Sequence, residues 1–183
     1  DQSGNGNHGT LVESASYGAG RISSALFLAS SGDRLEVADH SSLDISDSIT
    51  LAAWIRPDDR GTQYFLTKKD KDRVDGFELS LSRKGVVFVR FNQDSSGNDY
   101  RVNSSSRYPT DGQTWIHVAA TYDGSTIRIY VNGQLENSEN ANFQIGTNDL
   151  PLVIGAGEGG YRGMTGAIDD VRVYNRALSA SEI

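Results

Sequence analysis

Oxygen-bearing side chains alternate with glycines at the start of the chain, in the stretch DQSGNGNHGT. The oxygen-bearing residues at two-residue spacing are Asp1, Ser3, Asn5 and Asn7. The intervening glycines let the backbone turn sharply, so that carboxylate, amide and main-chain oxygens can point at one centre. Calcium prefers about six to eight such ligands. The stretch therefore predicts part of a calcium site that needs a second acidic contributor, and a solvated, mobile loop is the alternative.

A second group of candidate residues lies on two neighbouring strands, FELSLS (77–82) and VVFVRFNQ (86–93). Their alternation predicts a core face with Val87, Val89 and Phe91, and an outward face with Phe88, Arg90 and Asn92 beside Glu78, Ser80 and Ser82. Aromatic rings with planar polar groups beside them are typical of sugar-binding surfaces. The alternative is an ordinary solvated sheet face. Including two loops, the expected ligand-binding residues are Phe88, Arg90, Asn92, Tyr100, Arg101, Tyr161 and Arg162.

Other patterns that could carry chemistry are weaker. GAGEGG (155–160) matches G-x-G-x-x-G, but no helical sequence follows, so we expect a flexible turn and no nucleotide site. DKDRVDG (70–76) resembles a calcium loop, but Val74 stands where an oxygen ligand is needed. A charged hairpin loop is expected there, with a second cation site through Asp70, Asp72 and Asp75 as the alternative. The tryptophans Trp54 and Trp115 lie in apolar strands and are expected to pack in the core.

The elements that must position these residues are short strands bounded by Gly, Ser and Asp clusters. Hairpin turns are predicted at Lys84-Gly85, Asp123-Gly124 and Asn132-Gly133. Only residues 177–183 look helical, over one or two turns. Strands of this length and spacing predict an all-β fold, an antiparallel two-sheet sandwich. No internal repeat or linker divides the chain, so we expect a single domain over 1–183, cut from a larger protein.

The composition of the chain limits the classes of partner that it can bind. The net charge of −7 argues against nucleic acid, which requires a basic footprint. No segment approaches the roughly 20 apolar residues of a membrane span, so no membrane insertion is expected. The absence of cysteine excludes disulfides and thiolate metal sites.

Four stretches, in order, cover nearly the whole chain and resemble laminin G-like, or concanavalin A-like, jelly-roll modules. They are DQSGNGNHGTL, SGDRLEVADHSSLDISDSITLAAWIRPD, WIHVAATYDGSTIRIYVNGQ and GAIDDVRVYNRALSASEI. The resemblance implies a jelly roll in which the first and last strands lie side by side. It also implies that Asp169 completes a Ca²⁺ site with Asp1, Asn5 and Asn7.

The same resemblance raises the question of catalysis, because related sandwiches include glucanases. Their E-x-D-x-x-E strand motif is absent here, and Glu36 and Asp39 point to opposite faces of a strand. We therefore predict no enzyme activity and no catalytic residue.

Together these features predict a non-catalytic carbohydrate-binding module of an extracellular protein, secreted or at the cell surface. Structural calcium would stabilise it, a polysaccharide or other glycan would be its ligand, and neighbouring domains of a parent protein would flank it. Two alternatives stay open: a protein-adhesion or spacer module without a glycan site, and a glycan-cleaving enzyme.

Overall fold

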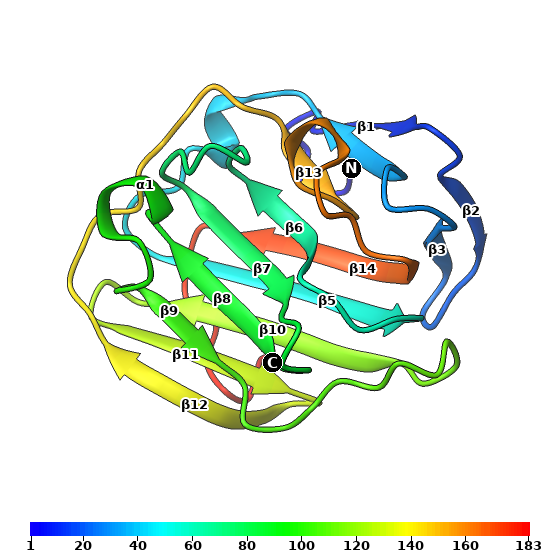
Figure 1. Cartoon of the computed structure of the whole chain (residues 1–183). Coiled ribbons are helices and arrows are strands. Elements are labelled where there is room, and N and C mark those ends of the chain that lie inside the picture. The colour runs from blue at the N-terminus through cyan, green and yellow to red at the C-terminus, as the bar shows by residue number, and fades with distance from the viewer.

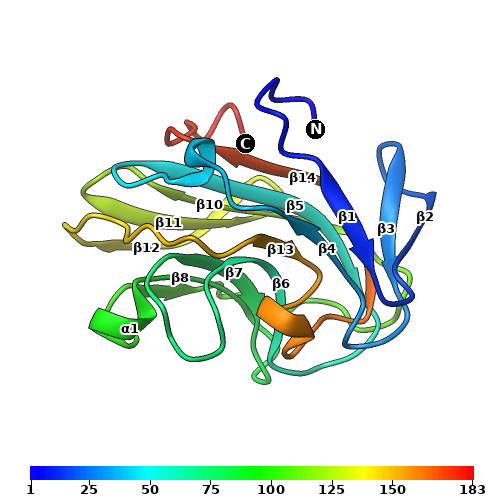
Figure 2. The same ribbon diagram turned by 90° about the horizontal axis from the view of Figure 1, so that it is seen from above.

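The strands form two seven-stranded sheets stacked face to face, as a computed structural model of residues 1–183 shows. The first sheet has the order β1 (Gly9–Val12), β4 (Arg34–Val37), β13 (Leu152–Ile154), β6 (Gln63–Lys68), β7 (Phe77–Leu81), β8 (Val87–Phe91), β9 (Arg101–Asn103). The second has the order β12 (Gln134–Asn140), β11 (Thr126–Val131), β10 (Ile116–Tyr122), β5 (Ile49–Pro57), β14 (Gly166–Tyr174), β3 (Ser24–Leu28), β2 (Ser16–Ala19). In Figure 1, β6 to β9 lie in front of β5, β10 and β14, and Figure 2 shows the same two layers from above.

All strand pairs within the two sheets are antiparallel, which confirms the predicted jelly-roll sandwich. The helical elements are single turns: η1 (Ser41–Leu43), α1 (Gln93–Ser96) and η2 (Glu158–Gly160). None of them is long and apolar enough to cross a membrane. The expected C-terminal helical turn is one hydrogen-bonded turn, in which the N–H groups of Glu182 and Ile183 donate to the Ser179 carbonyl.

The core is a cluster of 31 buried hydrophobic residues between the two sheets. Alternate residues of each central strand enter it, because neighbouring side chains of a strand point to opposite faces. On β8 these are Val87, Val89 and Phe91, as predicted. The other residues of β7 and β8 are therefore left on the outer face of the first sheet.

One strand neighbourhood implied by the resemblance is wrong. β1 pairs with β4 at the edge of the first sheet. β14 lies in the second sheet between β3 and β5. The first and last strands of the chain are therefore not neighbours, and this separates the residues expected to share a calcium ion.

Candidate functional site

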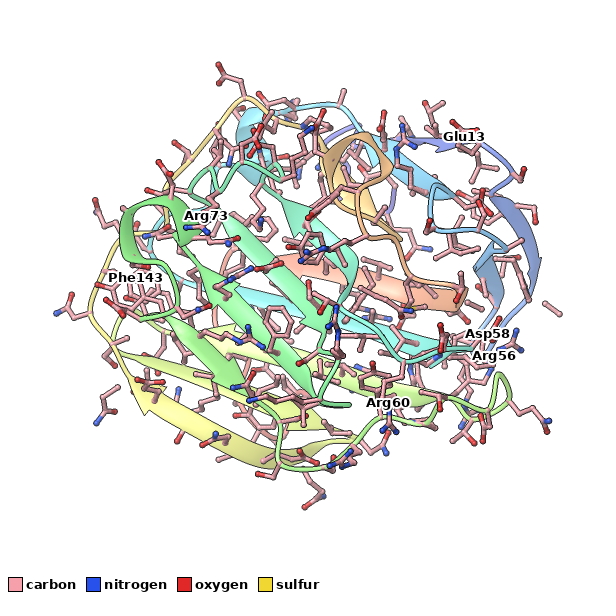
Figure 3. All side chains as sticks on the ribbon, in the orientation of Figure 1. Glu13, Arg56, Asp58, Arg60, Arg73 and Phe143 are labelled. Carbon is pink, nitrogen blue, oxygen red and sulfur yellow. The ribbon has the colours of Figure 1, made fainter.

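The outer face of the first sheet gathers charged and aromatic side chains from β6, β7, β8, β9 and the loop that follows β13. Figure 3 looks onto this face. We call it the basic face and define it by Tyr64, Lys69, Glu78, Phe88, Arg90, Arg101, Tyr161 and Arg162. Antiparallel pairing places its strand residues side by side, because Glu78 pairs with Arg90 and Ser80 with Phe88.

An ion pair forms the centre of the basic face. The Glu78 side chain is fully buried, and its Oε1 accepts from both Nε and Nη2 of Arg90. Its second oxygen, Oε2, accepts from the Ser80 hydroxyl at 3.1 Å. Arg90 also donates from Nη1 to the Asn98 side-chain oxygen at 2.9 Å. The only carboxylate of the face is therefore already hydrogen-bonded on both oxygens.

Arg101 covers the aromatic ring of the strand beside it. Its guanidinium carbon lies 3.7 Å from the centre of the Phe88 ring. Phe88 is 1% exposed, and Arg90 lies 5.6 Å from the same ring. The phenyl ring thus contacts two cations, of which the half-buried Arg101 is the outer one.

The loop after β13 extends the face over β6. The Tyr161 ring centre lies 6.0 Å from that of Tyr64 in an edge-on arrangement, and Arg162 lies 4.9 Å from the Tyr161 ring. Lys69 lies 5.1 Å from the Tyr64 ring on the other side. Both Tyr161 and Arg162 are exposed, whereas Tyr64 and Lys69 are buried. The loop therefore lies against Tyr64 of β6 and leaves Tyr161 and Arg162 exposed above it.

Burial perturbs three titratable groups of this face. Desolvation, followed by the charge of Glu78, raises the pKa of Tyr64. Desolvation lowers the pKa of Lys69 and also that of Arg101, and the nearby Glu78 opposes both shifts. The three groups respond to the same carboxylate, which shows that they share one electrostatic environment.

Five of the seven residues expected to bind a ligand lie on the basic face, and two do not. Asn92 has a positive φ of 48°, so β8 ends before it, and its side chain is buried. Its Nδ2 donates to the Gln144 carbonyl at 2.7 Å and its Oδ1 accepts from Gly146 N at 2.8 Å. Asn92 therefore anchors the 144–146 segment and is not an outward-facing group.

Tyr100, directly before β9, also points away from the basic face. Its ring stacks on Phe143 with centres 4.0 Å apart and packs against the core cluster. Phe143 lies at the left edge of the molecule in Figure 3. Adjacent residues of a strand face opposite ways, so Arg101 can lie on the basic face only if Tyr100 points inward.

The residues expected to hold calcium are not brought together. Asp1 accepts hydrogen bonds from Ser3 and from the backbone of Asn7, and Asn7 donates to the Ser42 hydroxyl at 3.0 Å. Asn5 donates its backbone N–H to the Ser3 hydroxyl. This exposed segment folds on itself beside η1, in the way expected of a polar loop.

Asp169 faces a different part of the molecule. It is buried, its Oδ2 accepts from Ile22 N at 2.8 Å in the β2–β3 turn, and its Oδ1 accepts from Asp170 N at 2.7 Å. A Cβ on Gly20 would lie 2.4 Å from Oδ2, so this turn fits closely around the carboxylate. The four residues thus do not fit one shared ion, and calcium binding itself stays a prediction.

Two carboxylates of the acidic loop 70–76 accept backbone hydrogen bonds, one from within the loop and one from α1. Asp70 accepts from the backbone of Asp72 and Val74, and Asp75 accepts from Ser95 N. No three His, Cys, Asp or Glu side chains in the chain are grouped in a way that could hold a metal ion. The charged hairpin loop is the better description of this segment.

The prediction that both tryptophans pack in the core is wrong. Trp54 and Trp115 are half-buried and line a groove of about 610 Å³ on the outer face of the second sheet. Arg21 lies 4.9 Å from the Trp54 ring on one side, and the His117 ring lies 5.4 Å away. Arg56, labelled in Figure 3, lies 5.3 Å from the Trp115 ring. This groove is a second candidate surface.

The alternation of residues 49–57 could have predicted that Trp54 faces outward. Leu51, Ala53 and Ile55 enter the core, so Trp54 must face outward. Tyr64 and Lys69 of the basic face were missed for a different reason. A bulge between Tyr64 and Leu66 interrupts the alternation of β6, and both Phe65 and Leu66 enter the core.

Three solved structures show the same fold over the whole chain. The binding domain of Paraclostridial Mosquitocidal Protein 1 superposes with a TM-score of 0.78 at 22% identity, covering 100% of this chain and 47% of that one. Domain 4 of AbnA, an extracellular GH43 arabinanase from Geobacillus stearothermophilus solved with arabinotriose, gives 0.75 at 21% identity, covering 100% and 89%. The binding domain of Botulinum Neurotoxin DC in complex with SialylT gives 0.75 at 14% identity, covering 100% and 46%.

Curated relatives are similar over a small part of their length. Human usherin is 25% identical over 145 residues, which cover 74% of this chain and 3% of usherin. The adhesion G-protein coupled receptor V1 of Danio rerio is 24% identical over 155 residues, covering 74% of this chain and 2% of the receptor. A family model described as the concanavalin A-like lectin/glucanases superfamily matches residues 29–183. With that match over most of its length and the jelly-roll sandwich described above, the chain belongs to the concanavalin A-like lectin/glucanases superfamily.

Proposed function

We propose that this domain is a non-catalytic carbohydrate-binding module of a secreted or surface protein, and that it binds a glycan on the basic face. One observation carries the proposal: an exposed aromatic ring and two accessible guanidinium groups, from β9 and from the loop after β13, lie on the same outer face of the first sheet. Tyr161 supplies an exposed ring, and Arg101 and Arg162 supply planar hydrogen-bond donors beside it. Sugar rings present C–H faces to aromatic groups and hydroxyls to such donors.

Similar structures support a binding role. Domain 4 of the arabinanase was solved with arabinotriose, and the botulinum binding domain was solved with SialylT. The arabinanase is described as extracellular, which agrees with a secreted or surface protein.

The chemistry of the face supports binding without cleavage. Retaining glycosidases place two carboxyl groups about 5–5.5 Å apart across the glycosidic bond. The basic face holds one carboxylate, and Arg90 and Ser80 bond both of its oxygens. Glu78 is also fully buried, so it is not placed to donate a proton to a glycan on the surface.

The competing function is protein adhesion. Similarity to an adhesion receptor favours it, and the Trp54 and Trp115 groove on the second sheet offers a separate surface.

Titration of the isolated chain with glycans separates the two functions. Isothermal calorimetry with arabinan, dextran and polygalacturonate is expected to show binding to at least one polymer. Tyr161→Ala is expected to weaken that binding by about threefold or more, because it removes an exposed ring. Tyr17→Ala is the matched control, since Tyr17 is an exposed tyrosine on β2 of the other sheet.

Two results would overturn this proposal in different ways. No binding to any of the polymers would reject the carbohydrate function and favour adhesion. Binding that Tyr161→Ala leaves unchanged, and that Trp115→Ala abolishes, would keep the carbohydrate function but move its site to the groove.

A further inference from the structure

Cations outnumber carboxylates on the basic face of a protein that is acidic as a whole. Lys69, Arg90, Arg101 and Arg162 share the face with the single carboxylate of Glu78. The whole chain carries a net charge of −7. The positive charge of this surface is therefore local, because the chain as a whole is negatively charged.

Glu78 neutralises only one of these cations. It pairs with Arg90 through both guanidinium nitrogens that face it. Lys69, Arg101 and Arg162 make no ion pair with any carboxylate of the protein. Arg101 donates to the Asn103 side-chain oxygen at 3.0 Å, which is a neutral partner.

Of these three cations, Lys69 is the most deeply buried and therefore carries the largest desolvation cost. It is 3% exposed, and its Nζ donates to the Asp70 carbonyl at 2.9 Å. A carbonyl and the Tyr64 ring attract a cation less than a carboxylate does. Glu78 and Asp70 attract the Lys69 ammonium group, but neither forms an ion pair with it, and burying a cation without such a partner destabilises the folded state. Desolvation accordingly lowers the pKa of Lys69, and it lowers that of Arg101 as well.

An anionic ligand would remove this cost. A carboxylate or sulfate ester placed between Arg101 and Arg162 would form charge-assisted hydrogen bonds with two accessible guanidinium groups that make no ion pair within the protein. The exposed Tyr161 ring beside Arg162 would pack against the sugar that carries the anion. Both kinds of contact are available within one surface.

We propose that the glycan bound by the basic face is an acidic saccharide, whose carboxylate or sulfate groups pair with Arg101 and Arg162 above the buried charge of Lys69. This inference rests on the carbohydrate-binding function proposed above and names its ligand class. The shared chemistry is an anionic group on a sugar ring, and uronate and sulfate ester are its two sources.

Matched polymers test the charge directly. Polygalacturonate is compared with its fully methyl-esterified form, and dextran sulfate with dextran, by calorimetry against the intact chain. We expect binding to at least one acidic polymer and a loss of about tenfold or more for its neutral counterpart. Binding to polygalacturonate alone identifies a carboxylate, and binding to dextran sulfate alone identifies a sulfate ester. Raising NaCl from about 50 to about 500 mM should weaken either interaction.

Variants that remove equal charge from different faces locate the interaction. Arg101→Gln and Arg162→Gln are each expected to weaken acidic-polymer binding several-fold. Arg128→Gln is the control, because it removes the same charge from β11 on the other sheet. Equal losses in all three variants would mean that net charge alone drives binding, and this would overturn the proposal.

Lys69→Met separates a ligand-binding lysine from a structural one. Methionine fills a similar volume without a buried charge, so thermal stability should be unchanged or higher. Affinity for the acidic polymer should fall several-fold, because a positive charge close to the bound anion is lost. A lower melting temperature together with unchanged affinity would show that Lys69 serves the fold, and would remove it from the proposed site.

The outcomes also separate this inference from the broader function. Equal binding of acidic and neutral polymers would reject the acidic class and leave the carbohydrate function in place. No binding to any polymer would reject both.

Discussion

At the scale of single residues, the buried Glu78–Arg90 pair is the contact on which the basic face depends. Replacing Glu78 by Gln leaves the Arg90 guanidinium buried without its partner, and breaking such a pair costs about 3–5 kcal/mol. Urea unfolding should show this loss. Glu36→Gln is the matched control, because Glu36 pairs with Arg34 at a partly exposed site where the cost is about 0–1 kcal/mol. Similar losses in the two variants would contradict the central role of Glu78.

A second residue-scale prediction concerns acid stability and Asp33. Its side chain is buried, and burial raises its pKa. Hydrogen bonds from the backbones of Ser30, Ser14 and Ala29 and from the Ser30 hydroxyl outweigh that effect, so the net pKa is lowered. The charged form thus stabilises the fold fully above the unfolded pKa of about 3.9, and this contribution is lost as pH falls through the folded pKa.

Asp33→Asn should therefore lower the free energy of unfolding at pH 7 by about 1–3 kcal/mol or more, because an amide nitrogen would face a hydrogen-bond donor. The difference from the wild type should shrink as pH falls from about 4 to about 3. Urea unfolding at several pH values measures both effects, with exposed Asp149→Asn as the control. A difference that stays constant with pH would be inconsistent with a lowered pKa.

At the scale of elements, the start of β14 depends on a glycine. Gly166 has a φ of +127°, and a Cβ there would lie 2.1 Å from the Arg56 carbonyl of β5. Gly166→Ala should cost more than about 4 kcal/mol or prevent folding. Gly133 has a φ of +77° with open space around it, so Gly133→Ala should cost only about 1–2 kcal/mol of backbone strain. Circular dichroism and urea unfolding compare the two, and equal stability would contradict this account.

How much of these elements the sequence predicts depends on whether alternation is continuous. On β7 and β8 it runs without interruption, so the outward placement of Phe88 and Arg90 was correctly predicted. The bulge in β6 and the left-handed backbone at Asn92 break the pattern at positions with no distinctive residue. For this reason Tyr64 and Lys69 were missed, and the prediction that Asn92 faces outward was wrong.

Which strands pair with each other, in contrast, could not be predicted from local patterns. The polar stretch at residues 1–10 was expected to be a loop, but its last residues begin β1, which pairs with β4 more than 20 residues away in sequence. Such long-range pairing is fixed by the packing of both sheets and has no local signature. For this reason the sandwich could be predicted, whereas the position of Asp169 relative to the N-terminal segment could not.

At the scale of the whole molecule, the two sheets carry different outer surfaces. The first presents the basic face, and the second presents the groove lined by Trp54 and Trp115. Because the outer surfaces of the two stacked sheets point in opposite directions, a ligand on the basic face leaves the groove free. A parent protein could therefore hold a glycan on one side of this domain while the other side contacts a neighbour.

Calcium is the remaining prediction at this scale. In the present arrangement the Asp169 carboxylate accepts two backbone N–H groups, and the N-terminal segment bonds to itself and to Ser42. Neither half needs an ion to satisfy its polar groups, so this arrangement, in contrast to the sequence, predicts that EDTA leaves the melting temperature unchanged. Asp169→Ala should lower it equally with and without calcium. A ligand that binds only the folded state raises stability with its concentration. If added CaCl₂ raises the melting temperature of the wild type and Asp169→Ala abolishes that rise, Asp169 is a calcium ligand, and the β2–β3 turn must supply the oxygens expected from Asp1, Asn5 and Asn7.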